Sequence, residues 1–132
     1  MSEEELKYPI GRFVKPRTFT RKLLKQYIID IETFPVKLRK ETDNLTGKQL
    51  DTKYRPGGWT IRQVINHCAD SHMNGFIRFK LALTENKPTI KPYFEAKWAE
   101  LPDSKTMETK PALGMIDGIH KRSGFSDCRH YL

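Results

Sequence analysis

Apolar residues recur at helical spacing most clearly between residues 61 and 84. Thr60 precedes this stretch and Gln63 stands three residues later, which is a capping-box pattern for a helix start. His67 and Ser71 lie beside the apolar stripe, so we predict a helix with His67 facing the interior. The stripe consists of Ile61, Val64, Ile65, Cys68, Phe76, Phe79 and Leu83.

Two further stretches show the same periodicity. Residues 18–42 carry one apolar face, with Thr18 or Thr20 as a possible cap, and Pro35 is expected to kink this helix or delimit its last turns. Residues 107–122 form a weaker candidate because they contain two glycines. No segment shows the alternation of a strand, so the pattern predicts an all-α fold.

The remaining segments are rich in proline, glycine and aromatic residues. Residues 1–17 read as an extended N-terminal arm whose apolar side chains pack on the body, and residues 50–59 as a loop. Residues 85–105 form a long aromatic crossover, and residues 123–132 an aperiodic tail. We therefore expect a single domain over residues 1–132, with three helices laid out like a four-helix bundle that lacks its fourth member.

Charge and composition argue against several classes of protein. The net charge is +8, but basic side chains are spread along the chain without a Lys/Arg block, which argues against specific nucleic-acid binding. No apolar run approaches the ~20 residues of a membrane span, and the N-terminus does not resemble a secretory signal. Two cysteines, Cys68 and Cys128, give no disulfide framework, so we expect a cytoplasmic protein.

The polar centre of the second predicted helix is the part of the chain that could carry chemistry. A neutral imidazole at His67 could bind a divalent metal if other ligands converge on it, while the alternative is a core histidine hydrogen-bonded to a neighbour. His72 lies roughly 140° round the helix from His67, so the two cannot chelate one ion together. Asp70 also points away and is expected to make a solvent-side or helix–loop hydrogen bond.

The other two histidines add no local motif. His120 is expected on a helix surface, and His130 lies in the tail. Neither histidine has a partner three or four residues away, and the chain contains no H-E-x-x-H, C-x-x-C or G-x-S-x-G pattern.

Three blocks of sequence together resemble the DinB-like, YfiT-type family of metal-dependent hydrolases. The blocks are Tyr8-Pro9-Ile10-Gly11, residues 50–85 with Gly58-Trp59-Thr60 and Asn66-His67-Cys68-Ala69-Asp70, and residues 88–104. The resemblance implies a four-helix bundle of up-down-down-up topology. It also implies one divalent metal (Zn, Ni or Fe) on three histidines, with His67 matching the first and an H-x-x-x-H on the last helix supplying the others.

The same resemblance implies a reaction class. A protein of this type is described as a bacillithiol S-transferase, so the implied activity is hydrolysis or transfer of a small-molecule thiol to an electrophile. The metal would lower the pKa of a bound water or thiol.

The sequence departs from the family pattern after Arg122. It continues as Ser-Gly-Phe-Ser-Asp-Cys-Arg-His-Tyr-Leu without H-x-x-x-H, as a frameshift or premature stop would produce, and the ligand role is not carried onto His130. We expect an incomplete metal site, impaired catalysis and an uncovered apolar surface that favours a homo-oligomer. The alternatives are a non-enzymatic helical remnant and a small basic binding or interaction module.

Overall fold

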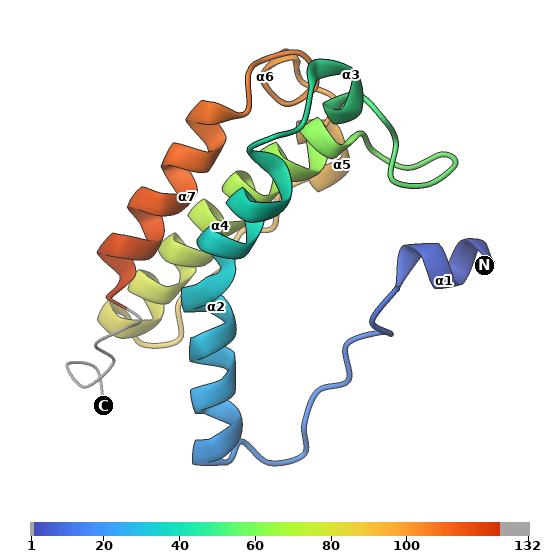
Figure 1. Ribbon diagram of the computed structural model, residues 1–132. Helices are drawn as coiled ribbons and strands as arrows, with labels where there is room; N and C mark the ends of the chain where they lie inside the picture. The colour runs from blue at the N-terminus through green and yellow to red at the C-terminus, as the bar shows by residue number, and fades with distance from the viewer. Residues whose placement is uncertain (1, 125–132) are drawn as a thin grey trace.

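Three long helices carry the fold in a computed structural model that describes residues 2–124, as the sequence pattern predicts. Figure 1 shows α2, α4 and α7 running alongside one another, with α3, α5 and α6 gathered at one end. Within the described residues there are no strands, and no helix is long and apolar enough to cross a membrane. The helices are α1 (Glu3–Lys7), α2 (Arg21–Thr42), α3 (Gly47–Leu50), α4 (Ile61–Thr84), α5 (Glu95–Trp98), α6 (Pro102–Lys105) and α7 (Lys110–Ser123).

The α4 helix begins where its capping box places it. The Thr60 hydroxyl accepts a hydrogen bond from the Gln63 backbone N–H at 3.1 Å, and the Gln63 side-chain oxygen accepts one from the Thr60 N–H at 3.0 Å. This exchange satisfies two N–H groups that otherwise lack partners at a helix start. The helix expected over residues 61–84 is therefore confirmed with its bounds.

The α3 helix is capped in the same way, although it was not expected. Thr46 and Gln49 form a second capping box of the same spacing. The helix has only four residues, so it carries no apolar periodicity that a pattern search could detect.

The first long helix starts at Arg21, after the Thr20 side chain accepts a hydrogen bond from the Leu23 N–H at 3.2 Å. Pro35 is buried inside α2, and the helix continues beyond it to Thr42. Figure 1 shows α2 changing direction partway along its length, as a proline inside a helix commonly causes.

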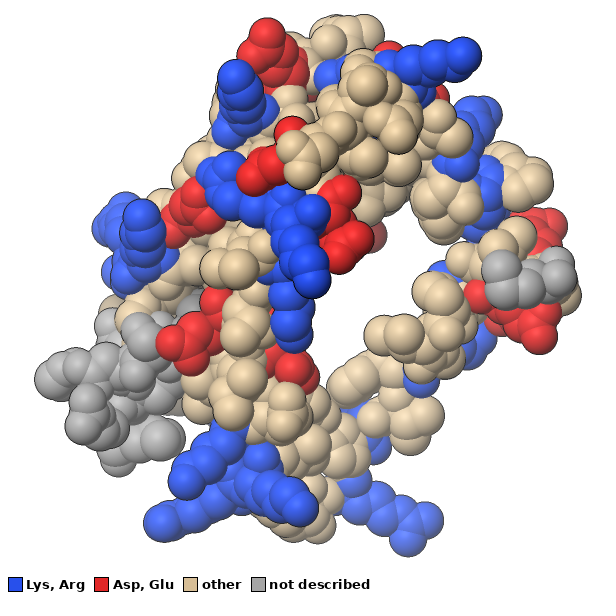
Figure 2. Space-filling model, in the orientation of Figure 1, with Lys and Arg blue, Asp and Glu red and all other residues tan. Residues whose placement is uncertain are grey.

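The N-terminal arm does not pack on the body, which corrects the expectation from its apolar residues. Ile10, Phe13 and Val14 are 98%, 80% and 82% exposed. The arm is also not extended throughout, because Ser2 caps the short helix α1. In Figures 1 and 2 the arm arches away from the helices and returns near residues 54–58, where Glu3 and Arg55 form an ion pair at 3.6 Å.

The hydrophobic core lies between α4 and α7, with α2 packed on α7. Ile65 and Ile116 are each 1% exposed and belong to the two facing helices. The α7 helix starts three residues later than expected, behind Thr109 and with Pro111 in its first turn. The buried cluster is Leu50, Ile65, Ala69, Ala112, Leu113 and Ile116, with Phe34, Leu38, Leu45, Ile61 and Cys68 packed against it.

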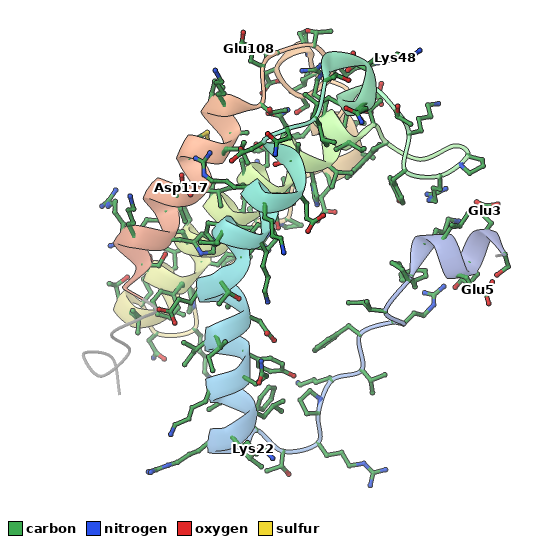
Figure 3. All side chains as sticks on the ribbon, in the orientation of Figure 1. Glu3, Glu5, Lys22, Lys48, Glu108 and Asp117 are labelled. Atoms are coloured by element: carbon green, nitrogen blue, oxygen red, sulfur yellow. The ribbon has the colours of Figure 1, made fainter. Side chains whose placement is uncertain are left out.

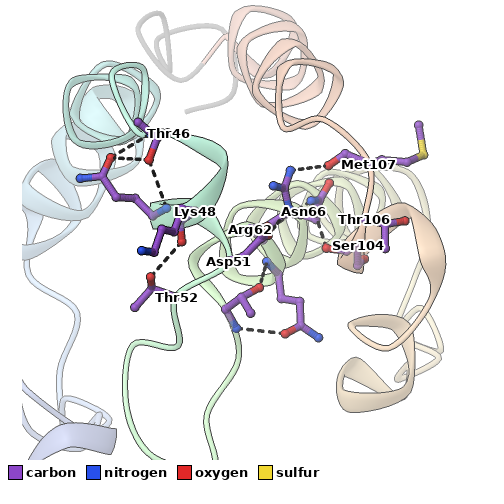
Figure 4. Close-up of polar contacts among 12 residues, drawn as sticks. Thr46, Lys48, Asp51, Thr52, Arg62, Asn66, Ser104, Thr106 and Met107 are labelled. Atoms are coloured by element: carbon purple, nitrogen blue, oxygen red, sulfur yellow. Dashed lines mark hydrogen bonds and ion pairs between the residues drawn. The ribbon is translucent and has the colours of Figure 1, made fainter.

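Ion pairs and side-chain bonds fix the helices and connections in register. Arg39 of α2 binds the carboxylate of Asp117 on α7, which Figure 3 labels. Arg62 of α4 reaches both the Asp51 carboxylate at 2.7 Å and the Met107 backbone carbonyl at 2.9 Å (Figure 4). The two bonds of Arg62 tie the α3–α4 connection and the α6–α7 connection to the start of α4.

Replacement of the buried Gln63 is expected to loosen the crossover. The Gln63 amide nitrogen donates to the Ala99 backbone carbonyl at 2.7 Å, and its oxygen closes the capping box. Gln63→Ala should therefore lower the free energy of unfolding by about 1–3 kcal/mol, measured by urea denaturation. Gln26→Ala is the control, because Gln26 makes only an exposed bond to Asp30 and should change stability by less than about 0.5 kcal/mol.

Candidate functional site

His67 lies on α4 beside the ring of Trp59, at the start of the helix. The two ring centroids are 4.9 Å apart and tilted by 56°, and the His67 side chain is half-buried. At about 100° per residue, His67 points nearly opposite to Ile65, which faces α7. The imidazole therefore sits at the edge of the body against Trp59, and not within the apolar core.

The carboxyl group of Asp70 interacts electrostatically with this imidazole, and the phenol of Tyr93 interacts with Asp70. Burial raises the pKa of Asp70 above its ordinary value, the nearby Asp103 carboxylate raises it further, and His67 partly opposes this. Burial also raises the pKa of Tyr93, which interacts electrostatically with Asp70. Asp70 is thus half-buried among charged groups rather than turned to solvent, and a carboxyl with a raised pKa is suited to exchange a proton.

Cys68 follows His67 in sequence but is not available as a thiolate. Burial raises the pKa of the Cys68 thiol to about 11. Since the thiolate is the form that attacks electrophiles and binds metals, Cys68 acts at neutral pH as a small apolar residue of the core.

His120 does not face a helix surface, which corrects the expectation from the sequence. Its Nε2 lies 2.6 Å from Nδ1 of His72, so a hydrogen bond joins α7 to α4. Burial lowers the pKa of both histidines, in the case of His72 to about 4. The two residues are 48 positions apart, and no local sequence signal indicates their contact.

The described residues do not complete a three-ligand metal site at His67. Across residues 2–124, no group of three or more His, Cys, Asp or Glu side chains is arranged to hold a metal ion. Catalytic zinc sites normally have three protein ligands and one open position. His67 remains a predicted ligand that still needs partners, and His130 lies outside the described residues.

Known proteins are similar to this chain in both sequence and fold. The model of the DinB superfamily matches residues 31–122. A Bacillus cereus (strain B4264) protein named "Putative metal-dependent hydrolase" is 56% identical over 118 residues, which cover 89% of this chain and 68% of the relative. A Bacillus mycoides (strain KBAB4) protein of the same description is 54% identical over 119 residues, 90% of this chain and 68% of the relative.

A solved structure agrees with the sequence comparison. YfiT from Bacillus subtilis, described as a probable metal-dependent hydrolase with an unusual four-helix bundle topology, superimposes with a TM-score of 0.88 at 44% identity. The match covers 96% of this chain and 71% of YfiT. The family model, the relatives and the shared bundle agree with one another, and the chain belongs to the DinB superfamily.

Proposed function

We propose that this chain descends from metal-dependent hydrolases of the DinB superfamily and that His67 is the metal ligand contributed by α4. The observation that carries this proposal is the position of His67. Its imidazole is half-buried against Trp59, on a side of α4 turned away from the α7 interface. The names of the relatives support dependence on a divalent metal in the family, whose identity we leave among Zn, Ni and Fe.

Within residues 2–124, His67 is the one ligand that this proposal assigns. The two further histidines would come from an H-x-x-x-H on a fourth helix, and residues 2–124 contain no such pair. When bound by all three, a divalent metal would supply the acidity that converts a bound water or thiol into a nucleophile. The half-buried Asp70, which interacts electrostatically with His67, is the group of this chain that could take or return a proton there.

Thiol transfer to an electrophile is the finer version of this proposal. A metal held by His67 and further ligands would supply the acidity that makes a small thiol nucleophilic, on the side of α4 that α7 does not cover. The half-buried Cys68 does not substitute for that thiol, because burial raises its pKa to about 11 and favours the protonated form. We place this chemistry in the cytoplasm, where low-molecular-weight thiols are reduced.

Two other functions compete with the enzymatic one. A small basic binding module is disfavoured, because Lys and Arg intermix with Asp and Glu over the face shown in Figure 2 and form no single groove. The second alternative is a helical protein without the enzymatic activity of its relatives. It is compatible with His67 as the single candidate metal ligand among the described residues. The apolar side chains exposed on the arm and on α2 favour self-association in either case.

A zinc titration tests whether His67 binds metal in this chain without further ligands. We expect His67→Ala to change the zinc dissociation constant by less than about twofold, because one imidazole contributes little to affinity when water fills the other positions. Isothermal titration calorimetry of the wild type and of His67→Ala measures this directly. A large loss of affinity in His67→Ala would show that other residues of this chain already complete a site around His67.

A further inference from the structure

A cavity lies between α4 and the segment that connects it to α5. Its volume is about 430 Å³, which is within the range typical of small-molecule sites. In Figure 1 the chain leaves the end of α4 and runs back along this helix to α5. One wall of the cavity is this returning segment, through residues 89–94, and the other wall is α4, through side chains between residues 74 and 81.

Arg78 contributes a guanidinium without a carboxylate partner to the α4 wall. Within residues 2–124, four arginines are half-buried, and Arg78 is one of them. The other three each bind a carboxylate of the chain, in the pairs Arg39–Asp117, Arg55–Glu3 and Arg62–Asp51. None of the ion pairs in this part of the chain includes Arg78. Because charged groups that lose contact with water are usually paired, Arg78 is suited to bind an anion from outside the chain.

The other charges around the cavity also favour an anion. Lys91 adds a second positive charge on the wall formed by the returning segment. Tyr93 lines the cavity as a neutral phenol, because burial raises its pKa. Asp70 and Glu95 interact electrostatically with Tyr93, but neither belongs to the lining, which contains no acidic side chain among the described residues.

Most of the remaining lining is apolar and could cover an organic molecule. The rings of Tyr93 and Trp98 pack together, with centroids 4.6 Å apart and a tilt of 50°. Ile77 on α4 and Ile90 on the returning segment are 49% and 40% exposed, so a bound apolar group would remove further surface of both from water. A hydrated inorganic anion would leave these side chains in water, whereas an acid with an apolar body would cover them.

We propose that this cavity binds a small organic acid, whose carboxylate pairs with Arg78 and Lys91 and whose apolar body lies against Trp98. A guanidinium can offer two parallel N–H donors to one carboxylate, so Arg78 is the main anchor. Arg78 follows His67 by eleven residues, roughly 20° round α4 and about 16 Å further along its axis. The site is thus separate from His67, and the proposal does not rest on the metal-dependent function.

Titration of the full chain with 3-phenylpropionate tests this site. Amide NMR spectra are recorded with EDTA present, so that no metal contributes. We expect a dissociation constant on the order of 1 mM or tighter, with the largest shifts in residues 74–81 and 89–94. Two matched compounds separate the contributions to binding. 3-Phenylpropanamide keeps the apolar body without the charge, acetate keeps the charge without the body, and each should bind at least about tenfold more weakly.

Variants of the basic residues identify the anchor. Arg78→Gln should weaken 3-phenylpropionate binding at least about tenfold, because it removes the charge-assisted hydrogen bonds. Lys91→Gln should weaken binding less, since Lys91 is exposed. Arg21→Gln is the matched control, because Arg21 is an exposed arginine at the start of α2 and does not line the cavity. It should bind as the wild type does, and so should His67→Ala.

Several results would overturn the proposal. Equal binding of the acid and its amide, unaltered binding by Arg78→Gln, or shifts confined to other parts of the chain would each do so. An absence of binding at ~10 mM acid would also overturn it, because the affinity would then be too weak for a specific site. If the acid does not bind and Arg78→Gln instead changes the molecular mass measured by light scattering, a second copy of the chain occupies the cavity.

Discussion

Ile116→Ala is expected to lower the free energy of unfolding by about 2–5 kcal/mol, a large part of the total stability of a domain of this size. Ile116 is 1% exposed and belongs to the buried cluster that joins α7 to α4. Removing its side-chain carbons loses apolar burial and leaves a cavity that the rigid neighbouring helices fill only in part. Chemical denaturation followed by circular dichroism measures the loss.

Val36→Ala is the matched control for this core substitution. Val36 lies on α2 and is 73% exposed, so its truncation should change stability by less than about 0.5 kcal/mol. Equal losses at the two positions would mean that the α4–α7 interface is not the stabilising core. It would also mean that the exposed side of α2 is covered in solution, for example by a second copy of the chain.

Local sequence signals predicted α4 closely because its start and its periodicity are both encoded within a few residues. Thr60 and Gln63 determine the first turn, and the apolar spacing carries the helix to Thr84. The apolar spacing of residues 18–42 likewise predicted the end of α2 at Thr42. Short helices were missed, because α3 and α1 contain too few residues for periodicity to appear.

Features that depend on distant residues could not be predicted in this way. The contact between His72 and His120 joins two helices across 48 positions, and neither histidine has a diagnostic neighbour. The prediction that the N-terminal arm packs on the body was wrong for a related reason. Apolar side chains such as Ile10 and Phe13 indicate a need for burial, but the sequence does not specify what surface covers them.

Supplying a fourth helix is expected to convert His67 into a strong metal ligand. The test protein replaces residues 125–132 with the segment of YfiT that carries its fourth helix and the proposed H-x-x-x-H. Ligands on one scaffold bind the ion intramolecularly, so zinc affinity should rise at least about a hundredfold over the present chain. Isothermal titration calorimetry measures affinity and stoichiometry for both proteins.

Substitutions in this fusion test the role proposed for His67. His67→Ala should abolish the gained zinc affinity, because it removes one of three ligands and leaves the other two on a single helix. His72→Gln should retain the gain, since His72 points away from His67 on α4. The backbone amides of α2 and of the arm should also become better protected when the helix is present, which amide hydrogen exchange can follow. A folded fusion that binds zinc no better than the present chain, or that keeps its affinity after His67→Ala, would remove His67 from the metal site and favour the helical remnant.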